Sequence, residues 1–130
     1  MSVRQVLIVE DDEDIAALLA LRVTRQGHGA TIARTGAEAL DRARAAAPDL
    51  ILLDLGLPDI HGWEVLERLR DDERLASVPV LVVSISDAGV STEHAVQGHI
   101  TKPFGAADLD RQVADALCAP PPITRRKARP

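Results

Sequence analysis

The sequence predicts an α/β fold in which five parallel strands form one sheet and five helices cover both of its faces. Short, largely apolar runs recur along the chain, and such runs are typical of strands buried on both faces of a parallel sheet. Longer segments with the apolar spacing of amphipathic helices lie between these runs. The alternation indicates helical crossover connections, which are right-handed in nearly all parallel sheets.

The central strand is predicted at residues 50–53, where four consecutive apolar residues lie between Pro48 and Pro58. The run at 30–33 is shorter and weaker, which favours a position at the edge of the sheet. The five predicted strands cover residues 6–9, 30–33, 50–53, 80–83 and 99–101.

The helices are predicted from apolar residues that recur every three or four positions. The first follows an acidic run at 10–14 and is expected to stop at Gly27 or Gly29, because glycine favours a helix end. The others are expected at 36–47, 63–71, 89–97 and 105–118, and the polar, glycine-containing 89–97 segment is expected to be short and marginal. The inward-facing residues are predicted to be Ile15, Leu18, Leu19 and Val23, then Ala37, Leu40, Ala43 and Ala47, then Leu66 and Leu69, and finally Leu109, Val113, Ala116 and Leu117.

Length and composition indicate one domain at residues 1–118, followed by a proline-rich, basic tail or linker at 119–130. The single cysteine, Cys118, excludes a disulfide framework and is typical of a reducing cytoplasm. No apolar run approaches the roughly 18 residues of a membrane span, and no signal-peptide pattern is present, so we expect a cytoplasmic protein without membrane contact. The acidic body also argues against direct nucleic-acid binding.

Polar and charged residues follow the predicted strands at the same rim of the sheet. They are Glu10, Asp11, Asp54, Ser84 and Lys102. In an open α/β sheet this rim is where ligands bind. Three carboxylates gathered there repel one another unless a hard cation lies among them, and Mg²⁺ suits oxygen ligands of this kind, with Mn²⁺ as an alternative.

Asp54 is the natural nucleophile of this group, because carboxylates form acyl phosphates. Phosphoryl transfer requires mainly positioning and neutralisation of the equatorial oxygens. Mg²⁺ would hold one oxygen, Lys102 a second, and the Ser84 hydroxyl with backbone amides a third. Residues 1–118 contain ten arginines and only this lysine, which indicates a place where a compact point charge is needed.

These motifs resemble the receiver domains of two-component response regulators. The matching residues are Ile8 to Asp12, Asp54 with Leu57, Pro58 and Gly62, Pro79 to Ser84, and Lys102 to Phe104. The resemblance covers residues 3–118, and the spacing of all four motifs makes it specific. It implies a flavodoxin-like, doubly wound sheet with the strand order 2-1-3-4-5.

The resemblance also implies residue roles. Asp54 would accept a phosphoryl group from a sensor histidine kinase or a histidine phosphotransfer protein. Asp11 would bind Mg²⁺ directly, Glu10 mostly through water, and Gly56 through its backbone carbonyl. Lys102 would contact the phosphoryl group. The chain would then be no enzyme beyond its own phosphorylation and dephosphorylation.

The resemblance further implies a switch. Ser84 would be the switch hydroxyl, and the output would be a downstream effector or an output domain, reached through a face at 87–109. Ile85 is bulkier than the usual residue after the hydroxyl, and His99 stands where a tyrosine or phenylalanine is usual. Inward rotation of His99 should favour the neutral ring. A homodimer through the last two predicted helices is a further expectation.

Three alternatives compete with this interpretation. A phosphatase of the haloacid dehalogenase type requires a second aspartate two residues after the first, and Gly56 occupies that position. A nucleotide-binding fold requires a glycine-rich loop where this chain has residues 10–14, all acidic. The third alternative is a receiver-like docking module that phosphorylation does not control.

Overall fold

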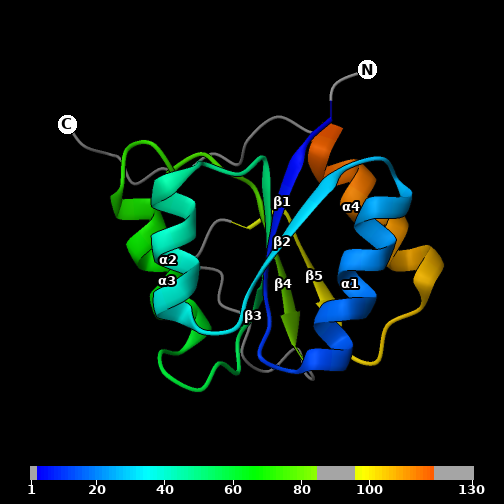
Figure 1. Ribbon diagram of the computed structural model, residues 1–130, viewed down its shortest axis with the longest axis horizontal. Coiled ribbons are helices and arrows are strands. Elements are labelled where there is room, and N and C mark those ends of the chain that lie inside the picture. The colour runs from blue at the N-terminus through cyan, green and yellow to red at the C-terminus, as the bar shows by residue number, and fades with distance from the viewer. Residues whose placement is uncertain (1–2, 85–95, 119–130) are drawn as a thin grey trace.

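The computed structural model describes residues 3–84 and 96–118 and contains a five-stranded parallel sheet with helices on both faces (Figure 1). The strands are β1 (Gln5–Val9), β2 (Gly29–Ala33), β3 (Leu50–Asp54), β4 (Val80–Ser84) and β5 (Gly98–Thr101). The helices are α1 (Glu13–Arg25), α2 (Gly36–Ala45), α3 (Gly62–Asp71) and α4 (Ala106–Cys118). Within these described residues, no helix combines the length and the apolar character needed to cross a membrane.

The sheet has the order β2-β1-β3-β4-β5, and every neighbouring pair is parallel. The predicted fold class and the edge position of the second strand are therefore confirmed. Helices α1 and α4 cover one face, and α2 and α3 cover the other (Figure 1). The order changes direction between β1 and β3, so the ends of these two strands lie side by side.

Alternate residues of the central strand supply two separate cores. Ile51 and Leu53 pack toward α2 and α3, whereas Leu50 and Leu52 pack toward α1 and α4. All five residues of β3 are buried, which is why the strand is apolar throughout until Asp54. The unbroken apolar run thus follows from helices covering both faces of the sheet.

The structure corrects three predicted core positions. Leu18 is 43% exposed, because α1 is rotated so that Ala16, Leu19 and Val23 face the sheet. Ala37 and Ala47 are also exposed. Helix α2 instead buries Ala39 with Leu40 and Ala43, and it ends at Ala45, before Ala47 is reached.

The predicted inward faces of α3 and α4 are confirmed, with Leu66, Leu69 and all four predicted residues of α4 buried. The helix expected at 89–97 falls mainly on residues outside the described part of the chain, and so does the tail at 119–130. Val96 and Gln97, which are described, precede β5 and belong to no helix.

Side-chain oxygens satisfy the first backbone amides of α1 and α2. Asp12 accepts hydrogen bonds from the amides of Asp14 and Ile15 at 2.9 and 3.0 Å. Asp59, from the loop between β3 and α3, accepts from the amides of Gly36 and Ala37 at 2.8 and 3.0 Å. These bonds favour the charged carboxylate, so the pKa of Asp59 is lowered.

Gly62 permits α3 to begin directly against the end of β3. Its amide donates to the carbonyl of Leu55 at 3.0 Å. A Cβ at this position would lie 2.6 Å from the Leu55 Cα and 2.8 Å from the Asp54 carbonyl oxygen. Both are backbone atoms beside the rim, so the chain cannot accommodate a side chain without moving the strand end.

Replacing Gly62 with alanine should therefore lower the free energy of unfolding by about 1–3 kcal/mol, the usual cost of overpacking. Urea denaturation followed by circular dichroism measures this change. Gly105→Ala is the matched control, because a Cβ added there would meet no atom within 4 Å among the described residues beyond its chain neighbours. Equal stability of the two variants would contradict the close-approach argument.

Candidate functional site

Three carboxylates meet where β1 and β3 end. Glu10 and Asp11 follow β1, and Asp54 is the last residue of β3. One oxygen from each lies within 4.8 Å of the others. Glu10 and Asp54 are 1% and 5% exposed, whereas Asp11 is exposed. The site is thus a mostly buried acidic cluster that opens to solvent on the side of Asp11.

Burial and charge repulsion act most strongly on Glu10. Its pKa is raised from 4.5 to about 7, first because burial disfavours the charged form and second because Asp54 lies nearby. A hydrogen bond from the Asp12 amide to Oε2, 3.2 Å long, and the ammonium of Lys102 oppose this shift. Glu10 therefore carries a proton more readily than an ordinary glutamate.

Lys102 provides positive charge to this cluster from the far side of β4. Its Nζ lies 3.1 Å from Glu10 Oε1 and 3.7 Å from Asp54 Oδ1. The Lys102 amide donates to the carbonyl of Ser84 at 2.7 Å, which fixes the residue at the end of β5. The Lys102–Pro103 peptide bond is cis.

The loop after β3 contributes directly to the geometry of Asp54. The amide of Gly56 donates to Asp54 Oδ1 at 3.1 Å, so this carboxylate closes a tight turn at the strand end. A Cβ on Gly56 would lie 3.9 Å from the same oxygen, an ordinary contact distance. The space beside this oxygen would therefore accommodate a Cβ without a clash.

The donor set fits a hard divalent cation. Three carboxylates offer oxygen ligands on neighbouring strand ends, and one side of the group is open to solvent. Glu10 Oε1 is buried and makes no well-directed hydrogen bond among the described residues, although it lies beside Lys102. A cation among these oxygens would relieve the repulsion that raises the pKa of Glu10.

Ser84 and His99 form a hydrogen bond on the α2–α3 face of the sheet. Ser84 Oγ and His99 Nε2 are 2.8 Å apart. The two residues come from β4 and β5 and are diagonal neighbours, because His99 pairs with Val82. Ser84 is buried and His99 is half-buried. Ile85, the third predicted switch residue, lies outside the described residues.

The structure therefore brings Glu10, Asp11, Asp54 and Lys102 together and places Ser84 beside His99. The two amide contacts of Asp59 were not anticipated, and an aspartate in a loop gives no sequence signal that separates a cap from a surface charge. The role of Asp12 as the cap of α1 accounts for one acid in the run at 10–14.

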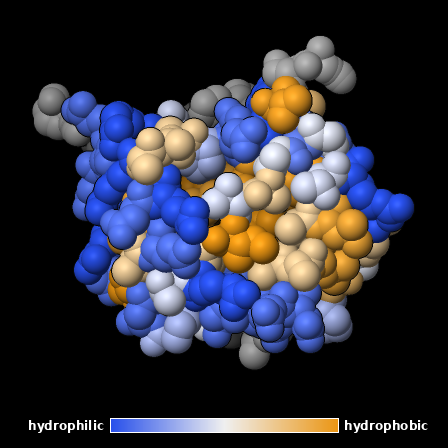
Figure 2. Space-filling view, viewed as in Figure 1, coloured by the Kyte–Doolittle hydropathy of each residue, from blue (hydrophilic) through white to orange (hydrophobic). Residues whose placement is uncertain are grey.

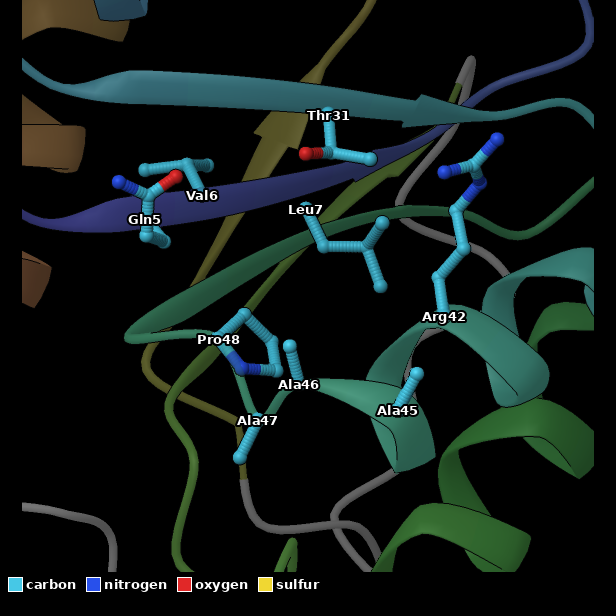
Figure 3. Close-up of a pocket in the computed structure, with 9 residues that line it drawn as sticks. All are labelled: Gln5, Val6, Leu7, Thr31, Arg42, Ala45, Ala46, Ala47 and Pro48. Atoms are coloured by element: carbon cyan, nitrogen blue, oxygen red, sulfur yellow. The ribbon is translucent and has the colours of Figure 1, made fainter.

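A cavity of about 250 Å³ was also not anticipated (Figure 3). Its lining consists of Gln5, Val6, Leu7, Thr31, Arg42, Ala45, Ala46, Ala47 and Pro48. These residues come from β1, β2 and the end of α2, at the opposite end of β1 from the acidic cluster. No sequence pattern indicates it, because the lining residues come from three separate segments of the chain and share no motif.

Comparison with known proteins identifies the class of protein that has this fold and sequence. The family model of the response regulator receiver domain matches residues 6–114. The chain is 39% identical over 105 residues to the polar-differentiation response regulator DivK of Brucella ovis, covering 78% of this chain and 85% of DivK.

Other similar proteins lead to the same family. The chain is 38% identical over 114 residues, 86% of its length, to the transcriptional regulatory protein YkoG of Bacillus subtilis, whose own role is uncharacterized. It spans about half the length of YkoG. The fold matches a CheY-like receiver domain protein of Methanospirillum hungatei with a TM-score of 0.79 and 26% identity, covering 89% of this chain and 94% of that one.

The chain therefore belongs to the response regulator receiver domains, the signalling modules of two-component systems. The predicted family is confirmed.

The raised pKa of Glu10 predicts how the metal-free protein responds to pH. Between about pH 4.5 and about pH 7 the folded protein holds a proton that the unfolded chain releases. The free energy of unfolding should therefore fall as the pH rises through this window. Urea denaturation in the presence of a chelator, at several pH values, measures the slope.

Glu10→Gln should flatten this slope, because the amide does not titrate. Glu13→Gln, at an exposed side chain, is the matched control and should keep the parent's pH dependence. An unchanged slope in Glu10→Gln would show that another group causes it.

Proposed function

We propose that Asp54 accepts a phosphoryl group from a phosphohistidine of a sensor histidine kinase or a histidine phosphotransfer protein, in a Mg²⁺-dependent reaction. The observation that carries the proposal is the place of Asp54. Its carboxylate lies within 4.8 Å of two further carboxylates and 3.7 Å from the only lysine in residues 1–118. This combination suits a cation and an incoming phosphoryl group at one carboxylate.

In the proposed reaction a carboxylate oxygen of Asp54 attacks phosphorus. An O–P bond forms, the N–P bond to the donor imidazole breaks, and the leaving imidazole takes up a proton. Lys102 neutralises charge on one phosphoryl oxygen, and the backbone amides after β3 are available to another. Bound Mg²⁺ would supply charge neutralisation at the phosphoryl oxygens, with Asp11, Asp54, the Gly56 carbonyl and, mostly through water, Glu10 as its ligands.

The consequence of phosphorylation is proposed to pass through Ser84 and His99. The phosphoryl group would add strong acceptor oxygens near the end of β4. Ser84 is the last residue of this strand, and its hydroxyl can donate a hydrogen bond. Its hydrogen bond to His99 connects the site to β5. A downstream effector, or an output domain joined through residues 119–130, would read this change, in a cytoplasmic setting.

One observation favours a second candidate function. Ser84 Oγ already shares a 2.8 Å hydrogen bond with His99 Nε2, and the tautomer of the ring decides which of the two groups donates. If this bond persists after phosphorylation, the chain would work as a docking module that phosphorylation does not control. Phosphorylation that leaves the backbone amide NMR shifts of residues 96–109 unchanged would identify this case.

The metal proposal predicts that Asp11→Asn weakens Mg²⁺ binding at least about tenfold, because a direct anionic ligand is lost. Trp63, in the first turn of α3, provides a fluorescence signal for the titration. Asp14→Asn is the control, because this acid lies outside the cluster of Glu10, Asp11 and Asp54. Equal Mg²⁺ affinity in the parent and in Asp11→Asn would contradict the proposed ligand set.

The chemistry predicts that Asp54→Asn abolishes labelling by acetyl phosphate or a phosphorylated kinase, because the amide is not a nucleophile. The side chain is nearly isosteric and loses a repelling charge, so the circular dichroism spectrum should not change. Asp71→Asn, at the exposed end of α3, should be labelled like the parent. Persistent labelling of Asp54→Asn would place the acceptor elsewhere.

A further inference from the structure

Strand β2 forms one edge of the sheet, and its outer side pairs with no strand among residues 3–84 and 96–118. Its inner side is bonded to β1: the Gly29 amide donates to Arg4 at 2.9 Å, and the Ala33 carbonyl accepts from Glu10 at 3.0 Å. Backbone groups of successive residues in a strand point to opposite sides. The amides and carbonyls of Ala30 and Ile32 therefore point outward.

The flanking outward positions are already occupied. The Arg34 amide donates to Glu38 Oε1 at 2.9 Å, and the His28 amide donates to the Val23 carbonyl at 3.4 Å. The available edge is thus short and bounded. It also lacks the usual protection of an edge strand, because Gly29–Ala33 contains no charged residue and no proline.

The flank of α1 beside this edge carries small side chains and one acid, Glu13, which pairs with Arg34 of the same chain at 3.5 Å. Arg22 and Gln26 bond to Asp110 of α4, which fixes the side of α1 that faces away from β2. The opposite side of the helix, by its 3.6-residue period, carries Ala17, Ala20 and Thr24. Figure 2 shows a region of apolar and weakly polar surface that extends from β2 over α1 on this face of the molecule.

We propose that this surface binds a second copy of the chain, with the two β2 strands pairing in antiparallel fashion across a two-fold axis at Thr31. In this register Ala30 of one copy faces Ile32 of the other, and each such pair exchanges two hydrogen bonds. The four outward groups of each copy are then all used. Thr31 faces Thr31, a favourable cross-strand pair that brings no like charges together.

The same two-fold axis also brings the α1 helices of the two copies together. Helix α1 runs opposite to β2, because residues 26–28 join the end of the helix directly to the start of the strand. The two α1 helices are therefore antiparallel, with Ala17 of one near Ala20 of the other, and small side chains permit close approach.

These features favour a second copy over an unrelated peptide strand. An identical strand meets the size match of Ala30 with Ile32, the Thr31 pair and the approach of the small α1 residues Ala17 and Ala20 at once. The contact is small, so the dimer is expected to be weak and concentration-dependent. It lies away from Asp54 and does not depend on the function proposed for that residue.

Sedimentation velocity of the full chain at concentrations up to about 1 mM tests the proposal at near-physiological salt. The parent should show a reversible monomer–dimer equilibrium, and Asp54→Asn should show the same one. Ala17→Lys should raise the dissociation constant at least about tenfold, because two cations are brought together between the helices.

Leu18→Lys is the matched control for Ala17→Lys. It introduces the same charge at the adjacent residue, which is 43% exposed and lies about 100° further around the helix, on the side away from the sheet. It should leave the dissociation constant unchanged. A parent that stays monomeric, or a dimer that Ala17→Lys does not weaken, overturns the proposal.

A disulfide tests the register. In a Cys118→Ser background, Thr31→Cys should form a covalent dimer on mild oxidation, because a Cα separation of about 4.5 Å across the axis permits the bond. Arg34→Cys should not, because the two positions would lie about 20 Å apart along the antiparallel strands. Equal cross-linking of both variants indicates random collision and contradicts the register.

Discussion

The structure depends on keeping two buried carboxylates, those of Glu10 and Asp54, at the ends of adjacent strands. Burying like charges side by side is costly, and the protein reduces this cost in two ways. Lys102 lies 3.1 Å from the first carboxylate and 3.7 Å from the second. Proton uptake by Glu10, whose pKa is raised to about 7, is the second way in which the repulsion is reduced. Both the ammonium of Lys102 and proton uptake by Glu10 therefore reduce the repulsion between the two carboxylates.

The fold is what brings the two carboxylates together. The acids can be adjacent only because β1 and β3 are neighbours at the point where the crossover connections change sides. The two cores hold these strands from both faces, and Gly62 lets α3 start within contact distance of the β3 end. Apolar packing on both faces thus holds the strand ends in place.

Sequence reasoning predicted the strands, their order by resemblance, and the meeting of the acidic residues with Lys102. It succeeded because a short apolar run such as the one at 50–53, which lies between two prolines, is typical of a strand buried on both faces. It failed at Leu18 and Ala37, because the exact rotation of a helix depends on packing partners and not on spacing alone. The bond between Ser84 and His99 was also beyond reach, since it depends on the diagonal register of β4 and β5.

The amide contacts of Asp59 have a consequence for the loop after β3. This carboxylate ties the middle of the 55–61 loop to the first turn of α2, at 2.8 and 3.0 Å. A loop that is already immobilised loses little conformational entropy when a ligand arrives. The segment carrying Gly56 is therefore partly ordered before any ligand arrives, by a side chain that lies outside the acidic cluster.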